Sequence, residues 1–97
     1  VYCMTKHAVE GLTKAMAVEL ASRGIRVNAV APTFIETELT RPMFSDVSFR
    51  REVLDAIPLG RIGTPEDIVG AVLFLASAAS ALVTGASLKV DGGWTAR

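Results

Sequence analysis

The first part of the chain carries hydrophobic residues at helical spacing. Apolar side chains recur every third or fourth position, while charged side chains fall away from that stripe. The spacing predicts an amphipathic helix over residues 2–23. Gly24 is the predicted stop, because glycine adopts the left-handed conformation at a helix end without a Cβ clash. The residues of the apolar stripe are Val9, Leu12, Met16 and Leu20.

A β-prone run follows this helix directly. Residues 25–31 are rich in branched apolar side chains, and Pro32 then removes the N–H that a central strand needs to continue its ladder. The pattern predicts a strand that ends at Pro32. A helix followed by a strand indicates an α/β unit, and ligands of open parallel sheets bind beyond the carboxyl ends of strands. Residues 32–37 are therefore expected at a binding site.

Residues 38–60 have mixed polarity, with Phe49, Val53 and Ile57 at helical spacing. We expect one short amphipathic helix beside the predicted binding turn. Such a segment can close over a substrate and exclude water. Its residues Met43, Phe44 and Phe49 either line a pocket under that lid or pack as ordinary core.

The last third of the chain predicts a second helix–strand pair. Thr64 and Pro65, followed by two acidic residues, form a strong helix start, with Thr64 as the cap. Residues 68–76 present a broad apolar face that should lie against a sheet. Residues 86–90 alternate as a last strand, and Asp91-Gly92-Gly93 closes it with a turn.

Composition restricts the class of protein. The 97 residues are 51% hydrophobic, with ten basic and ten acidic residues, which is typical of at most one small soluble domain. Neither charge sign forms a block, and the longest apolar run, residues 68–79, is shorter than a membrane span of ~18 residues. Nucleic acid and membranes are therefore not expected partners. The single Cys3 cannot form an internal disulfide, which fits the cytoplasm, and it is expected to be a small buried residue.

The candidate chemistry lies at the start of the first helix. Tyr2 and Lys6 are four residues apart, so a helix places both side chains on one face, about 6 Å apart along its axis. An ammonium group at that distance is expected to lower the pKa of a phenol, and Tyr2 could then exchange a proton near neutral pH. The alternative is a solvated lysine beside a tyrosine in an interface. His7 lies on a different face and is expected to be solvated.

Three linked segments resemble the short-chain dehydrogenase/reductase family. In chain order they are YCMTKHAVEGLTKAMAVELASRGIRVNAVAPTFIETEL, PLGRIGTPEDI and TGASLKVDGG. The resemblance covers nearly all of the chain. Within the family, the chain is similar to members that are 3-oxoacyl-acyl-carrier-protein reductases or sugar dehydrogenases. It implies an NAD(P)-dependent oxidoreductase that moves a hydride between nicotinamide and a carbonyl or secondary alcohol carbon.

The resemblance also implies an incomplete fold. The expected class is α/β: the C-terminal part of a doubly wound, Rossmann-like parallel sheet, with residues 1–97 as the C-terminal part of a single NAD(P)-binding domain. The family's glycine-rich phosphate loop, most of its strands and its catalytic serine would precede Val1. We therefore expect a truncated chain that is inactive by itself. The alternative function is a catalytically inert truncated segment or an oligomerisation piece, and sequence upstream of Val1 would separate the two.

The family's site residues are carried over position by position. Tyr2 would give or take the alcohol proton, and Lys6 would tune it and hold the nicotinamide ribose hydroxyls. The turn after the strand would bind the nicotinamide carboxamide through its backbone and a hydroxyl, with Thr33 in place of the usual glycine. Thr33 and Thr37 could instead merely close a loop. The expected cofactor-binding residues are Tyr2, Lys6, Pro32, Thr33, Ile35 and Thr37.

The resemblance leaves several properties open. The substrate is a small carbonyl or alcohol compound, either a sugar, a polyol or a 3-oxoacyl thioester, and the cofactor is NAD or NADP. No metal is expected. The first helix carries small residues that let another helix approach closely, and in the resembled family it packs against its copy. A homo-oligomer, either dimer or tetramer, is therefore expected. These small residues are Ala8, Gly11, Ala15 and Ala17.

Overall fold

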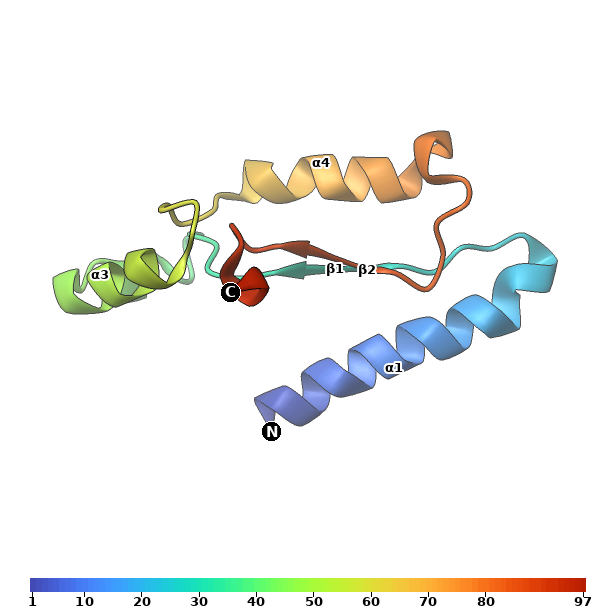
Figure 1. Ribbon diagram of the computed structural model, residues 1–97, viewed down its shortest axis with the longest axis horizontal. Coiled ribbons are helices and arrows are strands. Elements are labelled where there is room, and N and C mark those ends of the chain that lie inside the picture. Colours follow the sequence, from blue (N-terminus) through green and yellow to red (C-terminus); the bar gives the residue numbers. More distant parts are fainter. The chain divides into compact units, whose positions relative to one another are not determined.

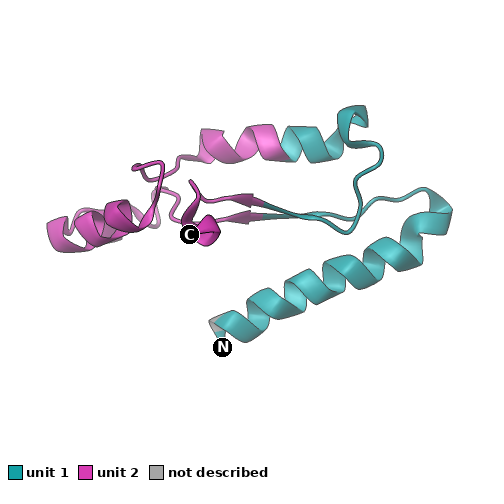
Figure 2. Cartoon of the chain, viewed as in Figure 1, with its two compact units in different colours: residues 1–30, 72–88 teal, residues 31–71, 89–97 magenta. Residues whose placement is uncertain are grey.

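The computed structural model describes residue 1 and residues 3–97, and it divides the chain into two compact units. Unit 1 comprises residues 1–30 and 72–88, and unit 2 comprises residues 31–71 and 89–97 (Figure 2). Figure 1 labels the main helices and strands in chain order.

Unit 1 begins with helix α1, Tyr2–Leu20, which continues as the 3-10 turn Ala21–Arg23. Gly24 ends it with a φ of 72°, and its N–H donates to the carbonyl of Ala21. This confirms the predicted stop, because only glycine adopts such a φ without a steric penalty.

The buried face of α1 is not its apolar stripe. Within this chain Leu12 of the apolar stripe is 60% exposed, whereas Thr13 and Ala17 are buried. Ala17 lies against the turn at Gly85, where an added Cβ would be 3.4 Å from the Cβ of Ala17. The helix therefore approaches the rest of unit 1 through small side chains, and its apolar stripe is not covered by this chain.

A two-stranded sheet pairs β1, Ala29–Pro32, with β2, Ser87–Val90. The N–H of Ala29 donates to Ala86, and the N–H of Thr33 donates to Val90. Both partners advance by four residues between these two bonds, so the strands are parallel.

The first strand starts four residues later than predicted, because side chains replace the sheet ladder before Ala29. The N–H of Val27 donates to the Thr84 hydroxyl at 3.1 Å. The amide of Asn28 donates to the Val83 carbonyl at 2.9 Å and accepts from the N–H of Ala86 at 3.0 Å. These bonds satisfy the backbone without making residues 25–28 part of a strand.

Arg26 joins the segment before β1 to residues 77–83. Its guanidinium donates to the Ser80 hydroxyl and to the carbonyls of Val83 and Ser77, at 2.9, 3.1 and 3.2 Å. Ser80 ends the 3-10 turn Ala78–Ser80 and is 1% exposed. The guanidinium fork thereby fixes two segments that are more than fifty residues apart in sequence.

Residues 38–60, which lie in unit 2, form two helices where one was predicted. They are α2, Arg41–Phe44, and α3, Val47–Ala56. They separate at Asp46, whose carboxylate accepts from the N–H of Phe49 at 3.1 Å and so caps α3. The unit has a small hydrophobic core of buried side chains, with Phe49 packed beside it. The core residues are Phe44, Val53, Ile57 and Ile62.

The aromatic residues of this segment are packed. Phe44 is 4% exposed, and its ring stacks on that of Phe49 with 5.8 Å between centroids. Met43 is exposed. Packing is thus confirmed for Phe44 and Phe49, while closure of the segment over a substrate stays a prediction.

Helix α4, Pro65–Ala76, has proline at its first position, as predicted. The hydrogen bonds at this helix start run in the opposite direction to the predicted cap, because Thr64 donates and does not accept through its side chain. The carboxylate of Asp67 accepts from the N–H of Thr64 at 2.8 Å and from its hydroxyl at 3.2 Å. The predicted apolar face is only partly covered, because Val69 in unit 2, and Val72, Leu73 and Phe74 in unit 1, are exposed. Among the described residues, no helix combines the length and the hydrophobicity that a membrane crossing needs.

The chain closes after β2 as the pattern predicts. Gly92 and Gly93 both have positive φ, 62° and 94°. The carboxylate of Asp91 accepts from the N–H of Gly93 and from both the hydroxyl and the N–H of Thr95. These bonds, led by the Thr95 hydroxyl, lower the pKa of Asp91. The turn leads into the 3-10 segment Trp94–Ala96.

Candidate site for proton transfer and cofactor binding

Lys6 lies in α1 of unit 1, on the half-buried face of the helix. Glu10, Thr13 and Ala17 follow it at intervals of four, three and four residues, which places all four on one side. The Glu10 carboxylate accepts from the Ser87 hydroxyl at 3.1 Å, so this side faces β2. Lys6 is thus on the helix face that carries the contact with Ser87 within unit 1.

The other predicted residues of the first helical turns have mixed outcomes. The side chain of Tyr2 lies outside the described residues, so its pairing with Lys6 stays a prediction. His7 is exposed, as expected, and its Nδ1 is 2.7 Å from the Cys3 carbonyl oxygen. Cys3 is exposed, and the expectation that it is buried is wrong. Among the described side chains of α1, the buried ones are Thr13 and Ala17, whereas Cys3, Met4 and Thr5 near its start are exposed.

The turn after β1, residues 33–37, belongs to unit 2 and holds an unusual backbone. Phe34 has a φ of 55° and is the one non-glycine residue with positive φ among those described. This left-handed conformation costs a residue with a Cβ about 1–2 kcal/mol. Thr33 has no positive φ, so its place in the family's glycine position requires no strained backbone. The strain lies one residue further on.

Two contacts hold Phe34 in this conformation. Its carbonyl accepts from the N–H of Gly63 at 2.9 Å. Its ring meets Trp94 edge to face, with 5.5 Å between centroids and 77° between planes. Such packing contributes about 0.5–1.5 kcal/mol beyond the buried area, which is comparable to the backbone strain.

Gly63 also fixes the next residues of the turn. Its carbonyl accepts from the N–H of Glu36 at 2.8 Å, so Ile35 and Gly63 form an isolated parallel bridge. Ile35 is thereby held between two hydrogen bonds to one distant residue. Among the described residues, the N–H of Ile35 itself has no hydrogen-bond acceptor.

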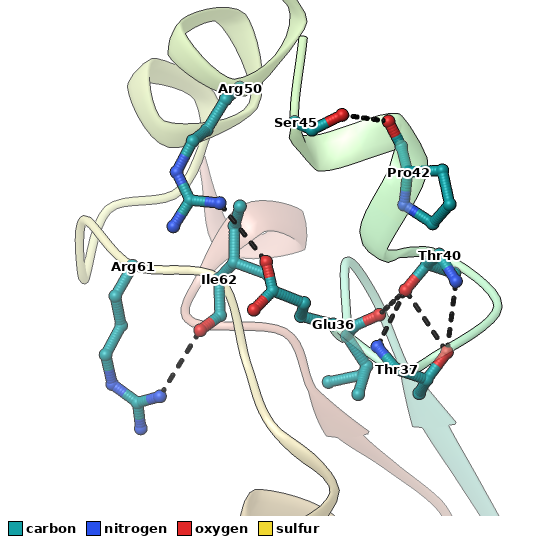
Figure 3. Close-up of polar contacts among 9 residues, drawn as sticks. Glu36, Thr37, Thr40, Pro42, Ser45, Arg50, Arg61 and Ile62 are labelled. Atoms are coloured by element: carbon teal, nitrogen blue, oxygen red, sulfur yellow. Dashed lines mark hydrogen bonds and ion pairs between the residues drawn. The ribbon is translucent and has the colours of Figure 1, made fainter. Parts of the chain in front are cut away.

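Thr37 closes the turn onto the start of α2. Its N–H donates to the Thr40 hydroxyl at 2.8 Å, and the N–H of Thr40 donates to the Thr37 hydroxyl at 3.2 Å (Figure 3). The Thr40 hydroxyl donates in turn to the Ile35 carbonyl at 2.7 Å. Glu36 accepts from Arg50 at 3.2 Å. Thr37 therefore has a loop-closing role, and cofactor binding by its hydroxyl stays a prediction.

A cavity of about 310 Å³ adjoins this turn within unit 2. Thr33 and Ile35 line it, together with Gly63, and residues 89–93 provide much of its remaining wall. Pro32 and Thr37 do not line it, and Lys6 belongs to the other unit. Of the predicted cofactor residues, the structure thus brings Thr33 and Ile35 to one cavity.

An ion pair completes the wall of the cavity. The guanidinium of Arg61 binds both oxygens of Asp67, at 2.7 and 2.8 Å. These bonds, with the N–H of Thr64, hold the pKa of Asp67 well below its usual range, and the same pair raises the pKa of Arg61. Asp67 is therefore a carboxylate at neutral pH. In the sequence, Asp67 is one of the two acidic residues of a helix start, and no local signal links it or Gly63 to the turn after β1.

Comparisons with known proteins agree with this architecture. The family described as enoyl-(acyl carrier protein) reductase matches residues 1–95. A 2-dehydro-3-deoxy-D-gluconate 5-dehydrogenase from Bacillus subtilis is 50% identical over 96 residues, which are 99% of this chain and 38% of that protein.

Two solved structures are also similar over nearly the whole chain. One is a gluconate 5-dehydrogenase from Burkholderia cenocepacia in complex with NADP and tartrate, with 45% identity and a TM-score of 0.93. It is matched over 99% of this chain and 38% of its own. The other is a 4-hydroxyisoleucine dehydrogenase complexed with NADH, with 41% identity and a TM-score of 0.95, over 99% and 40%. The chain spans about two fifths of the length of the proteins it matches.

These matches define an α/β protein of the Rossmann type, which confirms the predicted fold class. The chain belongs to the short-chain dehydrogenase/reductase family, as the match over residues 1–95 and the relative at 50% identity show.

Proposed function

We propose that this chain is part of an NAD(P)-dependent oxidoreductase that interconverts a carbonyl compound and a secondary alcohol. The observation that supports this most is the family match over residues 1–95, because it includes both Tyr2-x-x-x-Lys6 and the turn after β1. Two relatives were solved with NADP and with NADH, and both cofactors stay candidates here. The chain is proposed to be the C-terminal part of a single NAD(P)-binding domain.

The turn after β1 fits a nicotinamide. The Ile35 N–H has no acceptor among the described residues, so it can donate a hydrogen bond to the oxygen of a carboxamide. Ile35 and Thr33 line a cavity with room for a planar ring. When bound, the nicotinamide supplies or accepts the hydride. Pro32 and Thr37, at the two ends of the turn, are proposed to contact the nicotinamide beside Thr33 and Ile35.

The proton transfer is assigned to α1. In the direction of reduction, Tyr2 gives its phenolic proton to the carbonyl oxygen as the carbon becomes an alcohol carbon, and in oxidation it takes that proton back. The ammonium of Lys6 favours the phenolate and donates to the nicotinamide ribose hydroxyls. The substrate is a small carbonyl or alcohol compound, with sugars, polyols and 3-oxoacyl thioesters as candidate classes.

An inert oligomerisation segment is the second candidate function. The exposed apolar stripe of α1, which includes Val9, Leu12 and Met16, supports association with another copy. Association and catalysis are compatible, so we propose a cytoplasmic homo-oligomer, a dimer or tetramer, that is also an enzyme. If the active protein sedimented as a monomer, the proposed oligomer would be contradicted, but the proposed enzymatic function would stand.

The function is tested in a chimera in which this chain replaces the matched 96-residue segment of the Bacillus subtilis relative. Tyr2→Phe should lower kcat by about 10²–10⁴-fold with little change in nucleotide affinity, because it deletes only the proton donor. Lys6→Met should weaken nucleotide binding and shift the alkaline limb of the rate profile. His7→Gln, on another face of α1, is the matched control and should keep full activity. Near-wild-type turnover of Tyr2→Phe would refute the assignment.

A further inference from the structure

The turn after β1 cannot hold its shape by local preference alone. Phe34 occupies a left-handed conformation that residues with a Cβ rarely adopt, and such strained residues persist only where surrounding contacts fix them. The two hydrogen bonds that flank Ile35 both come from Gly63, which is 28 residues away in sequence. Gly63 is therefore the residue on which the position of Ile35 depends most directly.

A side chain at position 63 would meet the side chain of Ile35. A Cβ added there would lie 2.5 Å from Cδ1 of Ile35, a distance that real Cβ contacts do not show. Its next neighbours would be Asp67 Oδ2 at 3.6 Å and the Phe34 carbonyl oxygen at 3.7 Å, which are ordinary contacts. Gly63 has no positive φ, so alanine suits its backbone. The conflict is limited to one methyl group of Ile35.

The segment that carries Gly63 is itself fixed on both sides. Arg61, two residues before Gly63, binds both oxygens of Asp67. Thr64, the next residue, donates its N–H and hydroxyl to the same carboxylate. Asp67 thereby fastens the chain around Gly63 to the first turn of α4. The contact with Ile35 is made by an anchored segment and not by a mobile loop.

We propose that Gly63 is a positioning residue for the nicotinamide: it sets the place of Ile35, and the Asp67-centred turn holds Gly63 against it. The inference rests on the proposed function, because it concerns the same nucleotide site. It assigns a role to a segment outside the Tyr2–Lys6 pair and outside the turn itself. Gly63 does not touch the reacting atoms and acts through Ile35.

The experiment uses the chimera with the Bacillus subtilis relative, and whichever of NADP or NAD the unmodified chimera binds more tightly. Gly63→Ala should raise the KM for the nucleotide by about 5–50-fold, because Cδ1 of Ile35 must move and this side chain lines the cavity proposed for the nicotinamide; the expected effect is below the ~10²-fold that a misplacement of about 1 Å can cost. The melting temperature should change little, because only the end of one side chain must move. Gly70→Ala, in α4 with no atom within 4 Å of the added Cβ, is the matched glycine control and should keep the original KM.

A second substitution tests the proposed route. Ile35→Val removes Cδ1, the atom that the alanine would strike, so the pair Gly63→Ala and Ile35→Val should return the KM to that of Ile35→Val alone. A Gly63→Ala protein with unchanged KM would refute the positioning role. A rise in KM that Ile35→Val does not reverse would also refute it. So would a rise in KM that is accompanied by a matching fall in the melting temperature. If the unmodified chimera binds neither nucleotide, the proposed function fails and this inference fails with it; if only the Gly63 result is negative, the proposed function stands.

Discussion

Asn28 is the residue whose loss should separate stability from cofactor binding most clearly. Its side chain donates to the Val83 carbonyl at 2.9 Å and accepts from the N–H of Ala86 at 3.0 Å. Asn28→Ala deletes both bonds. At about 0.5–1.5 kcal/mol each, the loss is about 1–3 kcal/mol.

The surroundings of Asn28 narrow the expected loss of stability. The Val83 carbonyl keeps a donor, because Arg26 also binds it at 3.1 Å. The N–H of Ala86 is only half-buried, so water replaces part of its lost bond. We therefore expect a loss near the middle, about 2 kcal/mol, or a fall of about 4–8 °C in the melting temperature of a domain of about 150–250 residues.

The assay is thermal unfolding of the chimera followed by circular dichroism, with the nucleotide KM measured in parallel. The KM should stay close to the original, because the turn after β1 is held by Gly63 and not by Asn28. Asn28→Asp provides the control: its carboxylate still accepts from Ala86 but turns an oxygen toward the Val83 carbonyl. Relative to the wild type at each pH, this variant should recover as the pH falls through the carboxyl pKa, because a protonated carboxyl donates again. A loss below 0.5 kcal/mol for Asn28→Ala, or no recovery of the aspartate variant at low pH, would refute the role of these two bonds.

Two further predictions concern the candidate site. Thr37→Val should weaken nucleotide binding by about 2–12-fold, the equivalent of one hydrogen bond, while Thr37→Ser keeps the hydroxyl and the affinity; a lower melting temperature with unchanged affinity would leave Thr37 with its loop-closing bonds to Thr40 alone. The isolated 97-residue chain should bind neither NADH nor NADPH at micromolar concentration and should lack a cooperative melt, because few of its described hydrophobic side chains are buried and two strands leave sheet edges unpaired. Calorimetric titration with both nucleotides and circular dichroism test this, and tight binding by a folded monomer would contradict it.

The elements that local chemistry controls could be predicted from the sequence. Gly24 ends its helix because of its backbone freedom, Pro65 begins one because its φ suits the first turn, and Gly92 and Gly93 close the last strand with positive φ. Each of these depends on residues within a few positions. The parallel pairing of the two strands followed from the alternation of helix and strand along the chain.

Burial could not be predicted in the same way. The periodicity of α1 identified its apolar stripe correctly, but periodicity does not say which partner covers a face. In this chain the helix approaches the Gly85 turn through Ala17, because a small side chain permits the close contact that a leucine or methionine would prevent. The start of β1 was misplaced for a related reason: Asn28 and Thr84 compete with the ladder through side-chain bonds that a β-propensity pattern ignores.

The candidate site combines both situations. Resemblance located the turn after β1, since Pro32 and Thr37 occupy the ends of a family motif, and it identified Thr33 in place of the usual glycine, but it did not locate the unusual backbone. The structure has it at Phe34, and the residues that stabilise it, Gly63 and Trp94, are 29 and 60 positions away. A strained residue is a local property whose stability is entirely non-local, so a sequence pattern at the turn cannot reveal what holds it. From the positioning role proposed for Gly63, we therefore expect substitutions that affect nucleotide affinity not only in the turn but also around Gly63, where the sequence alone indicates nothing but a loop before a helix.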